Sequence, residues 1–177
     1  MEADGTLGAM DWDLQQVSSE ATQVVCEYLY DKSGVKRYFK ADSSAVKILD
    51  TLIVSDSNSG WSRVGACWHE WEVGAVGTVA ELRYFYPPSS THFFGSEEDG
   101  EIIQKYFPNS TGYEATFHFE AKATANKKPV NGVCESSIPL YRAFRNVAGN
   151  QNHIYHTDEA VVRAASGYTW EGVVACV

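Results

Sequence analysis

The sequence predicts an α+β fold of three pseudo-repeats, each with a strand, a turn, a second strand, a helix and a closing strand. Three observations carry this prediction. An ordered hairpin motif occurs three times, a helical apolar pattern follows each copy, and a glycine-aromatic step then leads into a β-rich segment. Because short turns join the strands, we expect antiparallel pairing. A unit of this size buries little surface alone, so the copies are expected to share one core.

The hairpin motif is clearest in the second and third copies, 79–121 and 134–177. Each has an Arg, a spacer and a Phe, then a turn, a His, two bulky apolar residues, and later a Ser or Thr followed by an acid. The first copy, 24–72, is fainter and has Arg37 where the others have His92 and His153. Residues 24–177 are therefore expected to form a single domain, preceded by a flexible leader or tag over 1–23.

The helices are predicted over 44–52, 97–107 and 158–165. In the first, apolar residues recur at the i, i+3, i+4 and i+7 positions of one helical face. Ser96 and Thr157, each followed by an acid, are expected to cap the other two helices.

A glycine followed by an aromatic residue leads into each closing strand, so we expect Trp61, Tyr113 and Tyr168 to occupy equivalent places. The strands are predicted over 64–71, 115–119 and 172–177. The connector 122–133, which contains a Lys-Lys-Pro sequence, is the segment most expected to be a flexible loop.

The four cysteines allow three pairings, and their number alone is equally consistent with free thiols. The repeats favour disulfides Cys26–Cys67 and Cys134–Cys176, because each pair then ties the start of one copy to its last strand. Disulfides are typical of an oxidising compartment. A glycosylation sequon at Asn109 agrees with secretion.

The third copy resembles a repeat family of unknown function whose members carry a "YR-x-F/Y, HFYT, GY-x-x-EG" pattern. The matching segments are 141–144, 153–157 and 167–172, and the second copy shares Thr91-His92-Phe93-Phe94. The first copy departs most, since it lacks the His and the Glu-Gly. The resemblance implies a module of secreted bacterial or fungal proteins, often beside a hydrolase domain, that binds glycan or cell-wall polymer and has no established catalytic residues.

Charge excludes several partners. The formal net charge is −9, which would repel nucleic acid and anionic membrane surfaces. No apolar run approaches the roughly 20 residues of a membrane span.

Motifs for catalysis are missing from the sequence. It contains no Gly-x-Ser-x-Gly elbow, P-loop or dinucleotide fingerprint. His153 and His156 would point to opposite faces of a strand, so they are not expected to share a metal ion. We therefore expect no catalytic residue, metal or cofactor. His92 and His153 are interpreted as buried structural residues, and Arg83 and Arg142 as partners of Glu114 and Glu171.

Aromatic residues make up 13% of the chain, and they suggest a ligand surface because ring faces pack against the CH faces of sugars. The candidate ligand-binding residues are Tyr86, Arg145, Tyr168 and Trp170. The leading hypothesis is a secreted, lectin-like module that binds carbohydrate or cell-surface polymer. Two alternatives are a protein-interaction module, such as an inhibitor of a secreted enzyme presenting the 122–133 loop, and a cell-wall polymer hydrolase.

Overall fold

The computed structural model describes residues 21–106, 117–147 and 150–177. Most of the predicted leader, the sequon at Asn109, Tyr113 and Glu114 lie outside these ranges. The described residues are mostly β-sheet with a few helices, which confirms the α+β class. No helix in them is long and apolar enough to cross a membrane.

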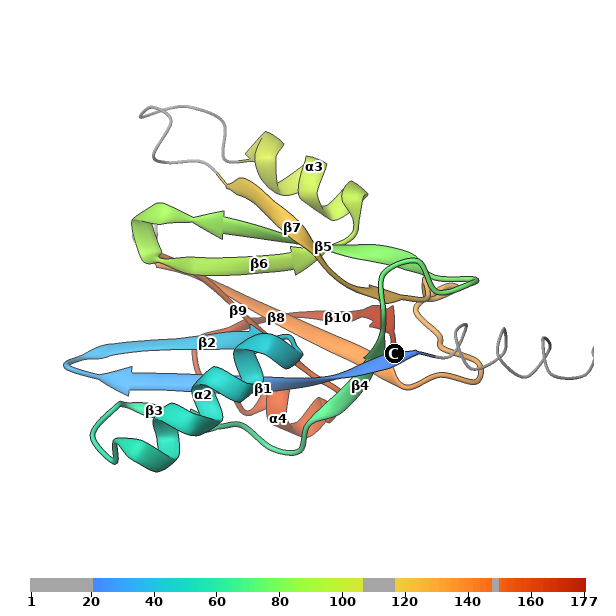
Figure 1. The fold of residues 1–177 in the computed structure, drawn as a ribbon. Helices are drawn as coiled ribbons and strands as arrows, with labels where there is room; N and C mark the ends of the chain where they lie inside the picture. Colours follow the sequence, from blue (N-terminus) through green and yellow to red (C-terminus); the bar gives the residue numbers. More distant parts are fainter. Residues whose placement is uncertain (1–20, 107–116, 148–149) are drawn as a thin grey trace, which may run out of the picture.

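The chain can be followed as three successive segments, each with a strand hairpin, a helix and one or two closing strands (Figure 1). The first contains β1 (Thr22–Lys32), β2 (Val35–Ala41), α2 (Ser43–Ser55), β3 (Trp61–Arg63) and β4 (Trp68–Trp71). The second contains β5 (Val79–Tyr86), η1 (Pro87–Ser89), β6 (Thr91–Gly95), α3 (Glu97–Tyr106) and β7 (His118–Asn126). The third contains β8 (Pro139–Val147), β9 (Asn150–His156), α4 (Glu159–Arg163) and β10 (Thr169–Cys176).

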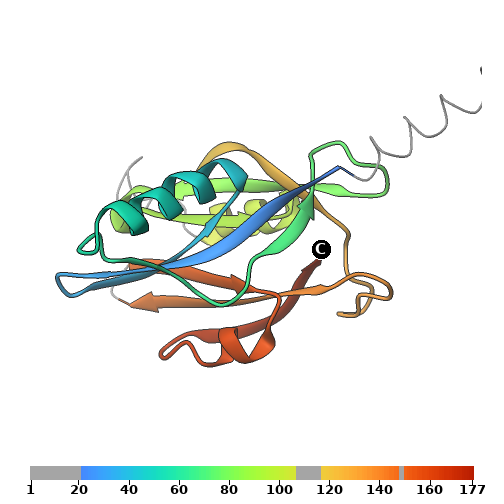
Figure 2. The same cartoon turned by 60° about the horizontal axis from the view of Figure 1, so that its bottom comes forward.

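The strand order is also the same in the three segments. The first strand of each hairpin lies in the middle, with the second strand on one side and the closing strand on the other. All of these pairings are antiparallel. The pairing of Trp71 with Ala125 joins the first two segments into one sheet, ordered β2-β1-β4-β7-β5-β6 with β3 beside β1. The third segment forms its own sheet, β10-β8-β9. In Figure 2 this sheet lies beneath β1 and β2, with α2 on the upper outer side and α4 on the lower outer side.

The second strands of the three hairpins are joined by side chains. The Asn152 amide bonds both backbone groups of Tyr38, as a neighbouring strand would. Its Oδ1 accepts from the backbone N of Tyr38 at 2.8 Å and its Nδ2 donates to the Tyr38 carbonyl at 2.9 Å. The Tyr155 hydroxyl does the same for Phe94, accepting from its N at 2.9 Å and donating to its carbonyl at 2.8 Å. These contacts connect β9 to β2 and to β6.

One buried cluster draws on all three segments, and three further clusters belong mainly to one segment each. The shared cluster contains Val25, Trp68, Phe94, Leu140, Tyr155 and Val177. A core between the segments therefore exists, whereas a common origin of the three segments stays a prediction.

Both predicted disulfides, Cys26–Cys67 and Cys134–Cys176, are confirmed. Each joins the beginning of its segment to the region of its closing strand. Trp61 and Tyr168 both directly follow a glycine with positive φ, at 84° and 81°. Trp61 is the first residue of β3, whereas Tyr168 immediately precedes β10.

The first closing strand is not continuous over 64–71 as predicted, because residues 64–67 separate β3 from β4. Gly65 has a φ of 66°, and a Cβ there would approach Nε2 of His156 to 2.7 Å. The same nitrogen lies 3.0 Å from the Val64 carbonyl oxygen. The strand is interrupted where a histidine of the third segment packs against it.

Two further predictions need correction. Asp158, and not Thr157, caps α4, since its Oδ1 accepts from the backbone N of Ala160 at 2.9 Å. The cap at Ser96 is confirmed, because its Oγ accepts from the backbone N of Asp99 at 3.1 Å. The connector 122–133 is a loop only in its second half, since β7 extends to Asn126 and Lys127 then pairs with Cys176. Small side chains at 123–125 let this segment pack inward despite its polar composition.

Candidate functional site

A cavity of about 430 Å³ lies between α3 of the second segment and the β8–β9 hairpin of the third. We call it the Arg142 cavity. Its lining residues are Phe93, Asp99, Ile102, Ile103, Arg142, Phe144, Asn146, Gln151, His153 and Glu171.

Strand alternation brings most of these side chains together. Arg142, Phe144 and Asn146 are two residues apart on β8, so they share one face of the sheet. The register pairs Phe144 with His153 and Asn146 with Gln151 on β9. The hairpin therefore presents an aromatic pair and an amide pair side by side.

Arg142 is buried and is held by carboxylates. Its Nε and Nη2 donate to the two oxygens of Glu171 at 2.8 and 3.1 Å, which confirms the predicted pair. Its Nη1 lies 3.6 Å from Oδ2 of Asp99. Burial opposes the charge, but interactions with Tyr155, Glu171 and Asp99 outweigh it and raise the pKa of Arg142. The guanidinium also lies over the Phe93 ring, 5.0 Å from its centroid.

The corresponding Arg83 is arranged differently. It binds Glu120 at 2.8 Å and approaches Asp42 at 3.5 Å. This acid comes from the closing strand, β7, just as Glu171 comes from β10, and Glu114, the predicted partner, lies outside the described residues.

Gln151 is the least satisfied polar residue of the cavity. The residue is 1% exposed, yet neither Nε2 nor Oε1 has a hydrogen-bond partner among the described residues, and Nη1 of Arg142 has none there either. The backbone carbonyl of Gln151 accepts from the hydroxyls of Ser89 and Thr91, which fixes the residue in place. An unpaired buried polar group costs about 1–3 kcal/mol, so these atoms indicate a place where a ligand or an ordered water binds.

His153 is 5% exposed, so its predicted burial is confirmed. Its ring stacks on Phe144 with centroids 5.7 Å apart and packs edge-on against Phe93 at 4.9 Å. Burial, and then the charge of Arg142, hold the pKa of His153 well below its ordinary value, so the imidazole is neutral. His156 points to the opposite face, where it contacts Val64.

A second cavity of about 300 Å³, the Trp61 cavity, occupies the corresponding place between the first segment and the second. Its lining residues are Arg37, Tyr38, Phe39, Ala45, Ile48, Leu49, Trp61, Ser90, Thr91 and His92. Its α2 residues lie three, six and seven positions after the N-cap Asp42 in the sequence. The α3 residues of the Arg142 cavity lie three, six and seven positions after the N-cap Ser96. His92 holds the place of His153, with Nε2 3.2 Å from Glu120, but it is half-buried and not buried as predicted.

The two matched cavities differ in chemistry. The α2 positions are Ala45, Ile48 and Leu49, whereas the α3 positions include Asp99. The Trp61 cavity is therefore the more apolar of the two.

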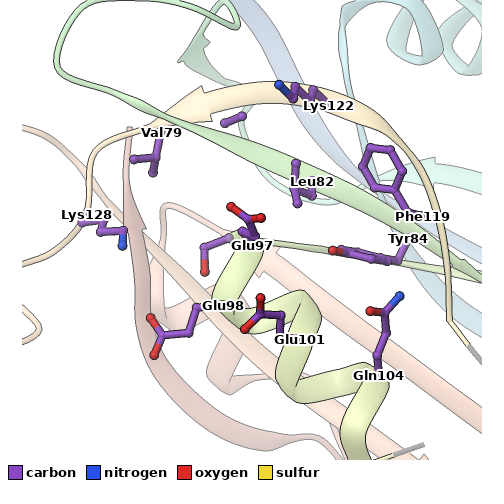
Figure 3. A pocket seen from close by; sticks show the side chains of 12 residues that line it. Val79, Leu82, Tyr84, Glu97, Glu98, Glu101, Gln104, Phe119, Lys122 and Lys128 are labelled. Atoms are coloured by element: carbon purple, nitrogen blue, oxygen red, sulfur yellow. The ribbon is translucent and has the colours of Figure 1, made fainter. Parts of the chain in front are cut away.

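A wider groove of about 720 Å³ lies between α3 and strands β5 and β7 (Figure 3). Figure 3 shows Glu97, Glu98 and Glu101 extending from the helix, with Tyr84 and Phe119 across from them. Its acids belong to the charged start of a helix. None of the unpaired buried polar side-chain atoms in the described ranges lies on a residue of this groove. It is therefore the weaker candidate.

The predicted ligand-binding residues are not gathered in one place. Tyr86 is buried in the second segment, where it stacks on Phe117 at 4.6 Å. Tyr168 packs against Tyr38, with ring centroids 5.4 Å apart. Burial, followed by the proximity of Tyr38, raises the pKa of Tyr168, and the opposing effect of Arg145 is smaller.

Trp170 stacks on Tyr141 at 5.5 Å and lies under the guanidinium of Arg163, 3.9 Å from the ring centroid. Arg145, Tyr168 and Trp170 thus share the third segment, but with Tyr86 they line neither matched cavity. Sequence reasoning missed Gln151 and Asn146. The available signal was the alternation along β8, which puts Arg142, Phe144 and Asn146 on one face.

No family model, curated protein or solved structure matches this chain.

Proposed function

We propose that this protein is a secreted, non-catalytic binding module that recognises carbohydrate of a cell wall or cell surface in the Arg142 cavity. The observation that carries the proposal is that the buried amide of Gln151 and Nη1 of Arg142, both unpaired among the described residues, line one cavity with aromatic walls. Buried polar groups of this kind are normally hydrogen-bonded, and a ligand would supply the missing partners.

The lining suits a sugar. Phe93, Phe144 and His153 offer flat ring faces for CH groups, while the two amides and two carboxylates offer partners for hydroxyls. The volume falls within the range of about 300–1,000 Å³ that is usual for ligand sites.

Binding without catalysis follows from how the acids are used. Both oxygens of Glu171 accept from Arg142, and Asp99 accepts from the backbone N of Ser96 at 3.2 Å. The oxygens of these carboxylates are therefore engaged in hydrogen bonds within the protein. The buried, neutral His153 serves as a ring face.

Secretion is supported by the two disulfides, which persist in oxidising compartments. Through the family resemblance, we also propose that the module acts beside a fused or associated secreted hydrolase. The pseudo-repeat is supported by the shared strand order, the matched disulfides of the first and third segments, and the matched cavities. The apolar Trp61 cavity would then be the degenerate counterpart of the Arg142 cavity.

A protein-interaction module is the second candidate. Val130 and Val133, exposed at 65% and 59% on the connector between β7 and β8, favour it because exposed apolar tips suit a protein partner.

The test is a glycan and cell-wall polymer array, followed by calorimetry, with Gln151→Leu and Trp170→Ala. Replacing an unpaired buried amide by an apolar side chain of similar size should leave stability equal or higher. We expect weak affinity in the wild type, micromolar to millimolar, and a loss of about tenfold or more in Gln151→Leu. Trp170→Ala, outside the cavity, should bind normally.

Unchanged binding by Gln151→Leu would contradict this location of the site. Turnover of a polymer by the isolated chain would contradict the absence of catalysis. Absence of glycan binding, with ordered water on the Gln151 amide in a crystal structure, would overturn the proposed function and leave the protein-interaction module.

A further inference from the structure

We infer that the Arg142 cavity selects uncharged or amino sugars with two neighbouring hydroxyls and rejects acidic sugars. This inference rests on the proposed function and concerns the same site.

The charges of the cavity do not balance. Arg142 is its cation, and its Nε and Nη2 are already satisfied by Glu171. Asp99 then supplies a second carboxylate without a second cation, and the buried His153 stays neutral. The formal charge of the lining residues is therefore −1, within a chain of net charge −9. A uronic or sialic acid would add another negative charge in a partly desolvated site, where like charges repel strongly.

The geometry between Arg142 and Asp99 fits a hydroxyl. Nη1 and Oδ2 are 3.6 Å apart, which is too far for a direct hydrogen bond. One hydroxyl oxygen about 2.8 Å from each atom could accept from Nη1 and donate to Oδ2. A carboxylate at this position could accept from Nη1 but would have no proton for Asp99.

The Gln151 amide provides the partner for a neighbouring hydroxyl. Its Nε2 donates and its Oε1 accepts, and the two atoms are unpaired. Of two adjacent hydroxyls on a sugar ring, one can accept from Nε2 of Gln151 and the other can donate to its Oε1. A hydroxyl pair can therefore satisfy the unpaired side-chain atoms of the described lining residues, namely the Gln151 amide and Nη1 of Arg142, with no charge added.

The Trp61 cavity does not share this selectivity. Its residue corresponding to Asp99 is Ala45, so the surplus carboxylate is missing there. The rejection of acidic sugars thus depends on Asp99, a residue of the second segment that faces Arg142 of the third.

The experiment uses the full chain and matched oligosaccharides of neutral, amino and acidic sugars on one array. Calorimetry then compares the β-1,4-linked hexamers of glucose, glucosamine and glucuronic acid. We expect neutral or amino members to bind about tenfold or more tightly than their acidic counterparts. Asp99→Asn should narrow this preference severalfold, and Glu171→Gln serves as a second variant if Asp99→Asn does not fold.

Glu98→Gln is the matched control, because it removes the same charge from the same helix but lies in the wider groove. An equal change of preference in Glu98→Gln would overturn the inference, since general repulsion would then explain it. Equal or tighter binding of acidic sugars by the wild type would also overturn the inference but leave the proposed function standing. Failure of every member to bind would overturn both.

Discussion

Lys40 lies fully inside the molecule, and its partners come from two other strands. Its Nζ is 2.8 Å from Glu70 on β4 and also contacts Glu81 on β5. The Trp68 indole donates to Glu70 at 2.9 Å, and the Asn126 amide donates to Glu81 at 3.0 Å. Two carboxylates around one buried cation compete for it, so the pKa of one of them is raised.

The pH dependence of stability should reveal this competition. Burial, followed by the charge of Glu70, raises the pKa of Glu81 from 4.5 to about 7. Between these values the native carboxyl keeps a proton that the unfolded chain has lost. Its contribution to stability is therefore fully present below pH 4.5 and lost as the pH rises through about 7.

The measurement is urea unfolding of the wild type and Glu81→Gln at about pH 5 and about pH 8. Glutamine does not titrate, so subtracting the two unfolding free energies removes the effect of the histidines. We expect the wild type to lose stability relative to the variant as the pH rises. A difference that is the same at both pH values would show that Glu81 titrates normally.

Individual residues of the site could be predicted only in part. The Arg142–Glu171 pair follows from sequence, because both residues recur in an ordered motif. Gln151 could not be predicted, because its role depends on contacts with another segment. The hydroxyls of Ser89 and Thr91 donate to its backbone carbonyl, and residues of α3 line the same cavity.

At the scale of elements, local patterns predicted what local physics determines. The helical apolar spacing located α2, and the glycine before Trp61 marked the start of β3. The break between β3 and β4 was missed because its cause, the ring of His156, lies far away in the sequence. The extension of β7 was missed because its alanines, Lys122 and Asn126 carry little β propensity, and pairing with β5 outweighs that preference.

The contact of β9 with β6 should depend on one hydroxyl. Tyr155→Phe removes the group that bonds both the N and the carbonyl of Phe94, and leaves two backbone groups buried without partners. We expect the free energy of unfolding to fall by about 1–3 kcal/mol. Tyr30→Phe is the matched control, because the Tyr30 hydroxyl has no hydrogen bond within the described ranges. A fall no larger than in the control would show that water replaces the lost bonds.

At the scale of the whole molecule, the three segments depend on one another through the shared cluster. Cys176 and Val177 end the third segment, and Val177 packs in the cluster with Val25 of the first and Phe94 of the second. Lys127 of the second segment pairs through its backbone with Cys176. A change at this end should therefore be felt by all three segments.

Removal of the Cys134–Cys176 disulfide tests this dependence. The bridge spans 42 residues of sequence, and closing a loop of this length stabilises by about 4 kcal/mol in the chain-entropy model. In the double variant Cys134→Ser/Cys176→Ser we expect one cooperative urea transition at lower denaturant, with tryptophan fluorescence and far-ultraviolet circular dichroism changing together. The tryptophans report on this well, because Trp68 lies in the shared cluster while Trp170 lies on the third segment. Two separate transitions would mean that the third segment unfolds alone. The Arg142 cavity, formed by residues of both the second and third segments, would then be lost before the rest of the fold.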